Sequence, residues 1–159
     1  MKAFLFIFSL FLMAFYNTML SDTISIYGVS IDLPVALVTL TAFSFNEFGT
    51  TWFAILLAIV ASTQRLDFMP WEIGSLAGIA IAVNMISVRM NLDSTASKLV
   101  LMGCSVLAHN ILITAVFSFE NFYFVLLRYI LPGVAYSLIL GWVFIVIGKG
   151  LLGLGRMRM

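Results

Sequence analysis

Long apolar stretches separated by short polar segments run along the whole chain. A membrane core of ~30 Å is crossed by about 20 mostly apolar helical residues, and most of these stretches approach or reach that length. The pattern predicts transmembrane spans at residues 3–20, 33–45, 51–63, 71–88, 99–119 and 131–148, with an interfacial segment at 122–130. We therefore expect an all-α integral membrane protein, a compact bundle of six, or five, transmembrane helices.

The first of these stretches allows two interpretations. Residues 3–20 follow Lys2, as the apolar part of a signal peptide would, but the sequence lacks a small-x-small cleavage site. The stretch also continues through Phe15, Tyr16 and Asn17. We therefore expect it to be retained as the first span.

Two prolines mark predicted helix boundaries. Asp32 can cap the second span by accepting hydrogen bonds from its first backbone N–H groups, and Pro34 is tolerated in a first turn. Pro132 removes a backbone donor within the last apolar run. We therefore expect a break there, between the interfacial segment and the sixth span.

Two glycines four residues apart lie in the fourth span. Gly74 and Gly78 form a GxxxG motif, which lets two helix backbones approach closely. The predicted contact lies either inside this bundle or with the transmembrane helix of a partner.

The single histidine lies beside an amide in the middle of the fifth span. His109 and Asn110 should sit near mid-depth, where an unpaired polar group costs on the order of several kcal/mol. We expect a structural polar core in which His109 and Asn110 hydrogen-bond across the bundle, with Asn84 of the fourth span as a partner. Ligation of a haem or chlorophyll by His109 is the alternative, although one histidine cannot form a bis-histidine site.

Composition changes this picture little. Of 159 residues, 63% are hydrophobic and 9% are charged, whereas a soluble domain has roughly 25% charged residues. The six spans use the whole length, so residues 1–159 are expected to form one polytopic domain. A net charge of +1 does not predict binding to nucleic acid, and the expected partners are lipid and other membrane proteins.

The basic residues predict the orientation. With the N-terminus inside, Arg89, Lys98 and the basic residues near both chain ends lie on the inner side, and only Arg65 and Arg128 lie outside. Because inner loops are enriched in Lys and Arg, we expect both termini to be cytoplasmic.

Chemistry of catalysis or metal binding is not apparent in the sequence. A hydrolase needs a nucleophile with a base, and a metal enzyme needs clustered ligands. The lone Cys104 is interpreted as a small packing residue, and the acidic residues map to helix ends. We therefore expect no catalytic residue, no metal site and no cofactor.

Four segments together resemble the rod shape-determining protein MreD family of bacterial cell-wall elongation, and the likeness covers nearly the full chain. They are residues 29–33 (Val-Ser-Ile-Asp-Leu), the end of the third span near Ala61 and Ser62, residues 107–112 (Leu-Ala-His-Asn-Ile-Leu), and residues 131–136 (Leu-Pro-Gly-Val-Ala-Tyr) before a span ending in Lys149. Family members commonly have a proline where Ile31 stands, followed by an acidic or amide residue. They often have an aspartate at the positions of Ala61 or Ser62 and of Asn110.

The resemblance implies a non-enzymatic scaffold in the bacterial inner membrane. Such a scaffold binds MreC and supports the RodA glycosyltransferase and its class B penicillin-binding protein, which make peptidoglycan in the elongasome. The resemblance also implies a fold similar to the substrate-binding subunits of energy-coupling-factor transporters.

Two other function classes are alternatives. A small-molecule-binding subunit of an energy-coupling-factor-type transporter needs a polar pocket reached from outside, and Asp22, Arg65, Asp67 and Trp71 are its candidate rim groups. An accessory subunit of a respiratory or photosynthetic assembly is the third class, which bound pigment would favour.

Overall fold

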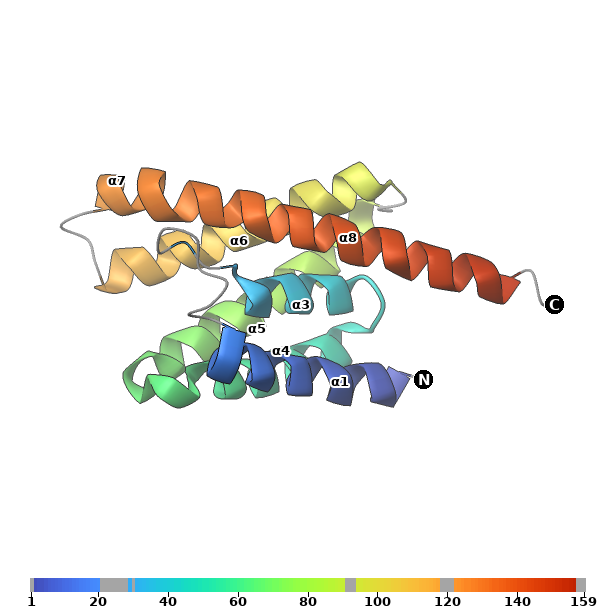
Figure 1. Ribbon diagram of the computed structural model, residues 1–159, viewed down its shortest axis with the longest axis horizontal. Helices are drawn as coiled ribbons and strands as arrows, with labels where there is room; N and C mark the ends of the chain where they lie inside the picture. Colours follow the sequence, from blue (N-terminus) through green and yellow to red (C-terminus); the bar gives the residue numbers. More distant parts are fainter. Residues whose placement is uncertain (1, 21–28, 30, 91–93, 118–121, 157–159) are drawn as a thin grey trace.

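Helices that run back and forth along one axis build the molecule (Figure 1). The computed structural model describes residues 2–20, 29, 31–90, 94–117 and 122–156, of which 93% are helical. In chain order the elements are α1 (Lys2–Phe15), the π-helical turn η1 (Tyr16–Leu20), α3 (Leu33–Ala42), α4 (Glu47–Ala61), the 3-10 turns η2 (Ser62–Gln64) and η3 (Leu66–Phe68), α5 (Met69–Met90), α6 (Thr95–Phe117), α7 (Phe122–Val125), the π-helical turn η5 (Leu126–Ile130) and α8 (Leu131–Arg156).

Helix length and apolar surface identify a membrane protein. Three helical stretches are long and apolar enough to cross a membrane, and only 28% of the most apolar window of each is buried inside the molecule. These stretches are Leu66–Met90, Thr95–Phe117 and Phe122–Ile147, and the shorter apolar helices are Ile7–Met19, Leu33–Ala42 and Glu47–Ala61. Apolar helices with so much uncovered surface need a lipid environment, which supports the predicted membrane class, and the all-α fold is confirmed.

The central helix is α3. It has 10 residues, so it is about 15 Å long, half of a ~30 Å membrane core. It contacts α1, α4, α5, α6 and α8, and seven of its residues are buried: Leu33, Val35, Ala36, Leu37, Val38, Thr39 and Ala42. Its first turn meets α6 near Asn110, two turns before α6 ends at Phe117. The start of α3 therefore lies inside the bundle.

The predicted break at Pro132 is wrong. The chain stays helical from Phe122 to Arg156, through α7, η5 and α8. The turn before the proline is π-helical, and the Leu131 N–H donates to the Leu126 carbonyl. This wider turn accommodates the missing N–H and the ring of Pro132 at the start of α8.

Local capping sets two other helix starts. The Asn46 side chain accepts a hydrogen bond from the Gly49 N–H and begins α4. The Ser94 hydroxyl oxygen accepts a hydrogen bond from the Ser97 N–H at 3.0 Å and begins α6. Both helices therefore begin four residues before the predicted spans.

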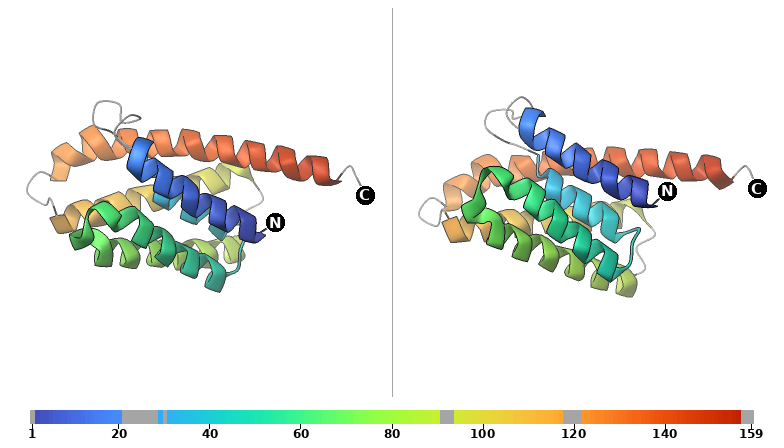
Figure 2. Two further views of the ribbon diagram at one scale, coloured as in Figure 1. Left: turned by 60° about the horizontal axis from the view of Figure 1, so that its bottom comes forward. Right: turned by 90° about the horizontal axis from the view of Figure 1, so that it is seen from below.

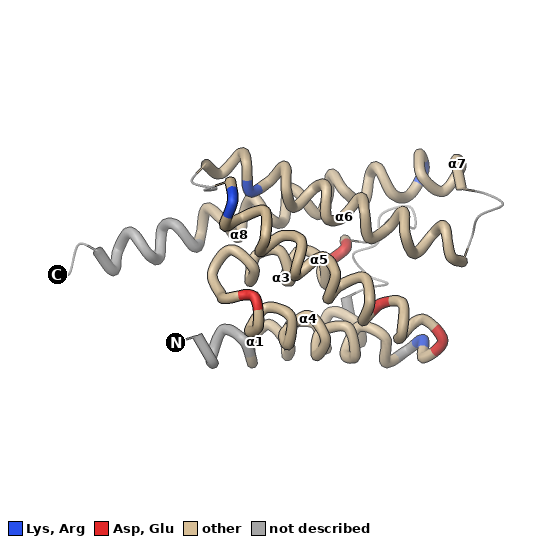
Figure 3. The backbone as a smooth tube through the Cα atoms, turned by 180° about the vertical axis from the view of Figure 1, so that it is seen from behind, with Lys and Arg blue, Asp and Glu red and all other residues tan. Residues whose placement is uncertain are grey.

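Both chain ends lie at the same end of the bundle, together with two basic residues. α1 begins and α8 ends at the same end of the molecule (Figure 1), and α8 extends beyond the other helices there (Figure 2). Lysine, arginine, aspartate and glutamate residues gather toward the two ends of the bundle (Figure 3). Arg89 at the end of α5 and Lys98 in the first turn of α6 share the end of the molecule with both chain ends.

Close contact between α6 and α8 depends on glycine. A Cβ atom on Gly141 would lie 2.3 Å from the Met102 sulfur, and one on Gly103 would lie 3.3 Å from Leu138 Cδ2. Gly141 is buried. These two glycines therefore let the α6 and α8 backbones approach.

We expect Gly141→Leu to lower the free energy of unfolding by ~1–3 kcal/mol because the added side chain overlaps Met102. Thermal unfolding in detergent measures this loss. Gly78→Leu is the matched control, because a Cβ on Gly78 meets no atom within 4 Å. Equal loss of stability in both variants would contradict the assigned packing.

Candidate functional site

His109 is held by two residues of α5. The His109 Nδ1 atom lies 3.0 Å from the Ser75 hydroxyl oxygen, and its Nε2 atom lies 3.6 Å from Glu72 Oε1. Glu72 and Ser75 are three residues apart and share one face of the helix. His109 is 6% exposed, so its imidazole is a buried link between α5 and α6.

The Glu72 carboxyl group faces the buried His109 imidazole, in an interior where a charge without a partner is costly. Both imidazole nitrogens are engaged by Glu72 and Ser75, which argues against His109 as a haem ligand.

The next residue on α6 binds the start of α3. The Asn110 Nδ2 atom donates to Asp32 Oδ2 at 2.7 Å and to the Val106 carbonyl at 2.9 Å. The Asp32 backbone N–H donates to the Ser137 hydroxyl of α8 at 3.0 Å. His109 and Asn110 are neighbours on α6, so the two pairs lie beside each other and form one polar core among α3, α5, α6 and α8.

Asp32 occupies the position before α3 but does not cap it with its side chain. Its backbone ψ of 71° lies outside the extended conformation that a capping side chain requires. The carboxylate is directed to Asn110 instead. Pro34 lies in the first turn of α3, as predicted.

The predicted partner Asn84 is wrong. Its Nδ2 atom donates to the Ala80 carbonyl of its own helix, and Asn84 lies nine residues beyond Ser75, about 13 Å along α5. Ser75 and His109 are each 17 residues from position 92, in the link between α5 and α6. Equal distance from a short link predicts contact in an antiparallel helix pair, and this signal identifies Ser75.

Glu72 departs from its predicted place at the membrane surface. It lies in the first turn of α5, but its side chain is only 15% exposed and faces His109. An acidic residue at a helix end is usually explained by the helix dipole. Here the short α3 leaves the His109 imidazole within reach, so the carboxylate turns inward.

Two further side chains hold the first helix. The Tyr16 hydroxyl donates to the Ile31 carbonyl at 2.9 Å. The Asn17 Nδ2 atom donates to the Val60 and Ala61 carbonyls at 3.0 and 3.1 Å, which satisfies the end of α4. Across the described residues, every buried side-chain nitrogen or oxygen has a hydrogen-bond partner.

The polar core leaves little free space. Beside Asp32 and Asn110 lies a hollow of about 130 Å³. Its other walls are Val29, Thr114, Val125, Tyr129, Ile130 and Gly133. Within the described ranges, His, Cys, Asp and Glu side chains do not gather in groups of three that could hold a metal ion.

Gly74 and Gly78 lie on an open face of α5. Both are exposed, and a Cβ atom added to either meets no atom within 4 Å. Ala82, four residues further, is also exposed. Among the described residues this motif therefore makes no close contact inside the bundle, and its contact with a partner helix stays a prediction.

We expect His109→Ala to lower the free energy of unfolding by ~1–3 kcal/mol, because Glu72 and Ser75 lose their buried partner. Denaturant unfolding in detergent measures the change. Asn84→Ala is the control, because Asn84 bonds only within its own helix. An equal loss of stability in Asn84→Ala would show that the contacts of His109 with α5 stabilise the protein no more than a hydrogen bond within one helix does.

Exchanging Asp32 and Asn110 tests the second pair. Asn110→Asp alone places two carboxylates against each other and should lower the melting temperature in detergent. The double variant Asp32→Asn with Asn110→Asp restores one amide and one carboxylate, and should recover the loss, with a coupling of ~1–3 kcal/mol. Additive losses in the double variant would refute the pairing.

Comparison with protein-family models, curated proteins and solved structures finds no match to this chain. The function is therefore inferred from the molecule's own features. These are the closed polar core, the open glycine face of α5 and the resemblance in sequence.

Proposed function

We propose that this protein is a non-enzymatic membrane scaffold of the bacterial rod-shape machinery. In this proposal it lies in the inner membrane with six helical passes and both termini in the cytoplasm. It binds MreC, and together they support RodA and its class B penicillin-binding protein. The observation that carries the proposal is the pair of exposed glycines on α5, where an added Cβ would meet no atom of the described residues within 4 Å.

The polar core supports a structural role for the interior. In the described residues every buried side-chain nitrogen or oxygen has a hydrogen-bond partner, and the adjacent hollow of about 130 Å³ is smaller than ligand pockets of roughly 300–1,000 Å³. A scaffold needs a rigid interior and a surface that its partner proteins can recognise. Both features favour a scaffold over a carrier of small molecules.

The Asp32 and Asn110 pair also supports the resemblance to the MreD family. In that family an acidic or amide residue opens the second helix, and an aspartate often stands at the position of Asn110. In this chain these two positions are hydrogen-bonded at 2.7 Å. The departure at Asn110 therefore keeps one carboxylate and one amide in the pair, with their places exchanged.

The transporter alternative has one observation in its favour, a larger cavity of about 730 Å³. That cavity lies at the end of the bundle that carries the chain ends, which is the cytoplasmic end in the proposed orientation. Of the candidate rim groups, Arg65, Asp67 and Trp71 are exposed but line neither cavity, and Asp22 lies outside the described residues. A pocket reached from outside is therefore not supported.

In the proposed mechanism a transmembrane helix of MreC packs on Gly74 and Gly78. Glycines four residues apart remove the side chains that would hold two helix backbones apart, so dispersion contacts form along the crossing. The scaffold fixes the position of its partner and catalyses nothing.

We expect Gly78→Leu to weaken MreC binding by ~1 kcal/mol or more, because the new side chain separates the two helices. Recovery of MreC with the tagged protein in mild detergent measures the effect. Ala135→Leu is the matched control, since Ala135 is exposed on α8. Unchanged recovery with a folded Gly78→Leu protein would remove this face from the proposal.

Mass spectrometry of everything that co-purifies with the tagged protein tests the function itself. MreC together with elongation enzymes would support the scaffold. Paired ATPases with a coupling subunit would overturn it in favour of a transporter.

A further inference from the structure

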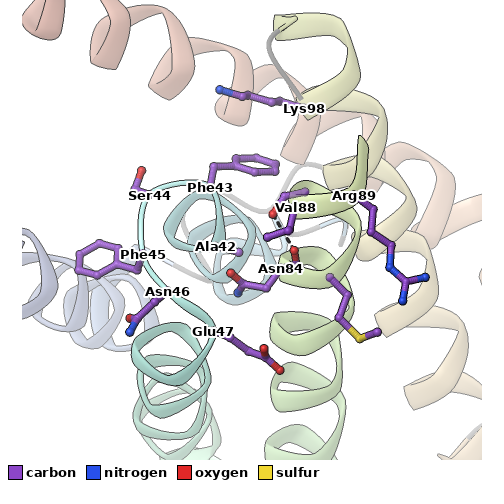
Figure 4. Close-up of a pocket in the computed structure, with 12 residues that line it drawn as sticks. Ala42, Phe43, Ser44, Phe45, Asn46, Glu47, Asn84, Val88, Arg89 and Lys98 are labelled. Atoms are coloured by element: carbon purple, nitrogen blue, oxygen red, sulfur yellow. Dashed lines mark hydrogen bonds between the residues drawn. The ribbon is translucent and has the colours of Figure 1, made fainter. Parts of the chain in front are cut away.

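A second feature of the molecule has no part in the scaffold proposal. A cavity of about 730 Å³ opens between the turn that joins α3 to α4, the last turns of α5 and the start of α6 (Figure 4). It is lined by Ala42, Phe43, Ser44, Phe45, Asn46, Glu47, Asn84, Met85, Ser87, Val88, Arg89 and Lys98. Its volume falls within the roughly 300–1,000 Å³ of small-ligand pockets.

The lining carries a surplus of positive charge. Arg89 and Lys98 face a single carboxylate, Glu47. In the described part of the chain, neither cation forms an ion pair, although the Lys98 ammonium lies 5.7 Å from the centre of the Phe43 ring. Figure 4 shows Lys98 above that ring and Arg89 beyond Val88. Among the described lining residues the two cations outnumber the one carboxylate, which favours an anionic ligand.

The inner wall adds polar groups at greater depth. Asn84 is 5% exposed, and its Nδ2 atom donates to the Ala80 carbonyl. The Ser87 hydroxyl donates to the Asn84 backbone carbonyl at 2.9 Å. The apolar side chains of Met85 and Val88 also line the cavity. The cavity therefore combines basic, polar and apolar groups, which is the combination that a phospholipid headgroup with its glycerol and acyl chains requires.

The position of the cavity indicates where the ligand comes from. Arg89 ends one long apolar helix and Lys98 begins the next, so both lie where the helices leave the hydrocarbon core. Basic pockets between transmembrane helices at this level bind anionic lipid headgroups. Free phosphate would have to compete with lipid that is present at high local concentration.

We propose that this cavity binds the phosphate of an anionic phospholipid, with Arg89 and Lys98 as its cationic partners. Glu47 lowers the positive potential of the cavity and limits the affinity. The site is independent of the glycine face on α5, so a lipid would occupy it whether or not a partner protein is bound.

Native mass spectrometry of the full chain in detergent tests the proposal, with added phosphatidylglycerol as the probe and phosphatidylcholine of the same acyl chains as its comparison. We expect tighter binding of phosphatidylglycerol, and the double variant Arg89→Gln with Lys98→Gln should weaken it ~10-fold or more. The matched control, Arg65→Gln with Arg128→Gln, removes the same charge at the opposite end and should bind normally.

Glu47→Gln keeps the test decisive if the double variant misfolds. Removing the carboxylate should tighten phosphatidylglycerol binding, a gain that misfolding cannot produce. Equal binding by wild type and a folded Arg89 and Lys98 variant, or no preference over phosphatidylcholine, would overturn the proposal. Binding of glycerol phosphate as tight as that of the lipid would assign the site to a soluble phosphate ester instead.

Discussion

A helix that starts inside a membrane bundle must find its hydrogen-bond partners in protein, and α3 is such a helix. Ten residues reach only half of a ~30 Å core, so the backbone at Asp32 cannot rely on water. Its N–H donates to Ser137 of α8, and its carboxylate accepts from Asn110 of α6. Because irregular backbone at membrane depth is tolerated only when protein covers it, the arrangement of α6 and α8 depends on this junction.

Two adjacent residues on α6 contact two different neighbouring helices. Side chains one residue apart point about 100° apart around a helix, so His109 reaches α5 while Asn110 reaches α3. The imidazole binds Glu72 and Ser75, and the amide binds Asp32. Two consecutive polar residues therefore connect three helices, and the glycines Gly103 and Gly141 bring the fourth helix, α8, close to α6.

Because the buried polar groups already have partners, contacts with other molecules are left to the surface. Every buried side-chain nitrogen or oxygen of the described residues already has a hydrogen-bond partner, and a carrier would need some of these groups for its cargo. What stays open is the face at Gly74 and Gly78 and the basic cavity at the end of the bundle. In the two proposals one takes another helix and the other takes a lipid headgroup, so both proposed ligands belong to the membrane.

The apolar pattern by itself determined the membrane class, the approximate helix positions and the need of His109 and Asn110 for partners, because these follow from hydrophobicity and the cost of unpaired groups. The break predicted at Pro132 was wrong, because the π-helical turn before it accommodates the missing N–H and the proline ring. Of the partners of this polar pair, Ser75 could be found from its equal sequence distance to the link between α5 and α6, which also excludes Asn84, nine residues or about 13 Å further along α5. The other two partners, Asp32 and Glu72, were decided by tertiary structure. Only packing around the short α3 brings Asp32 and Glu72 into the interior.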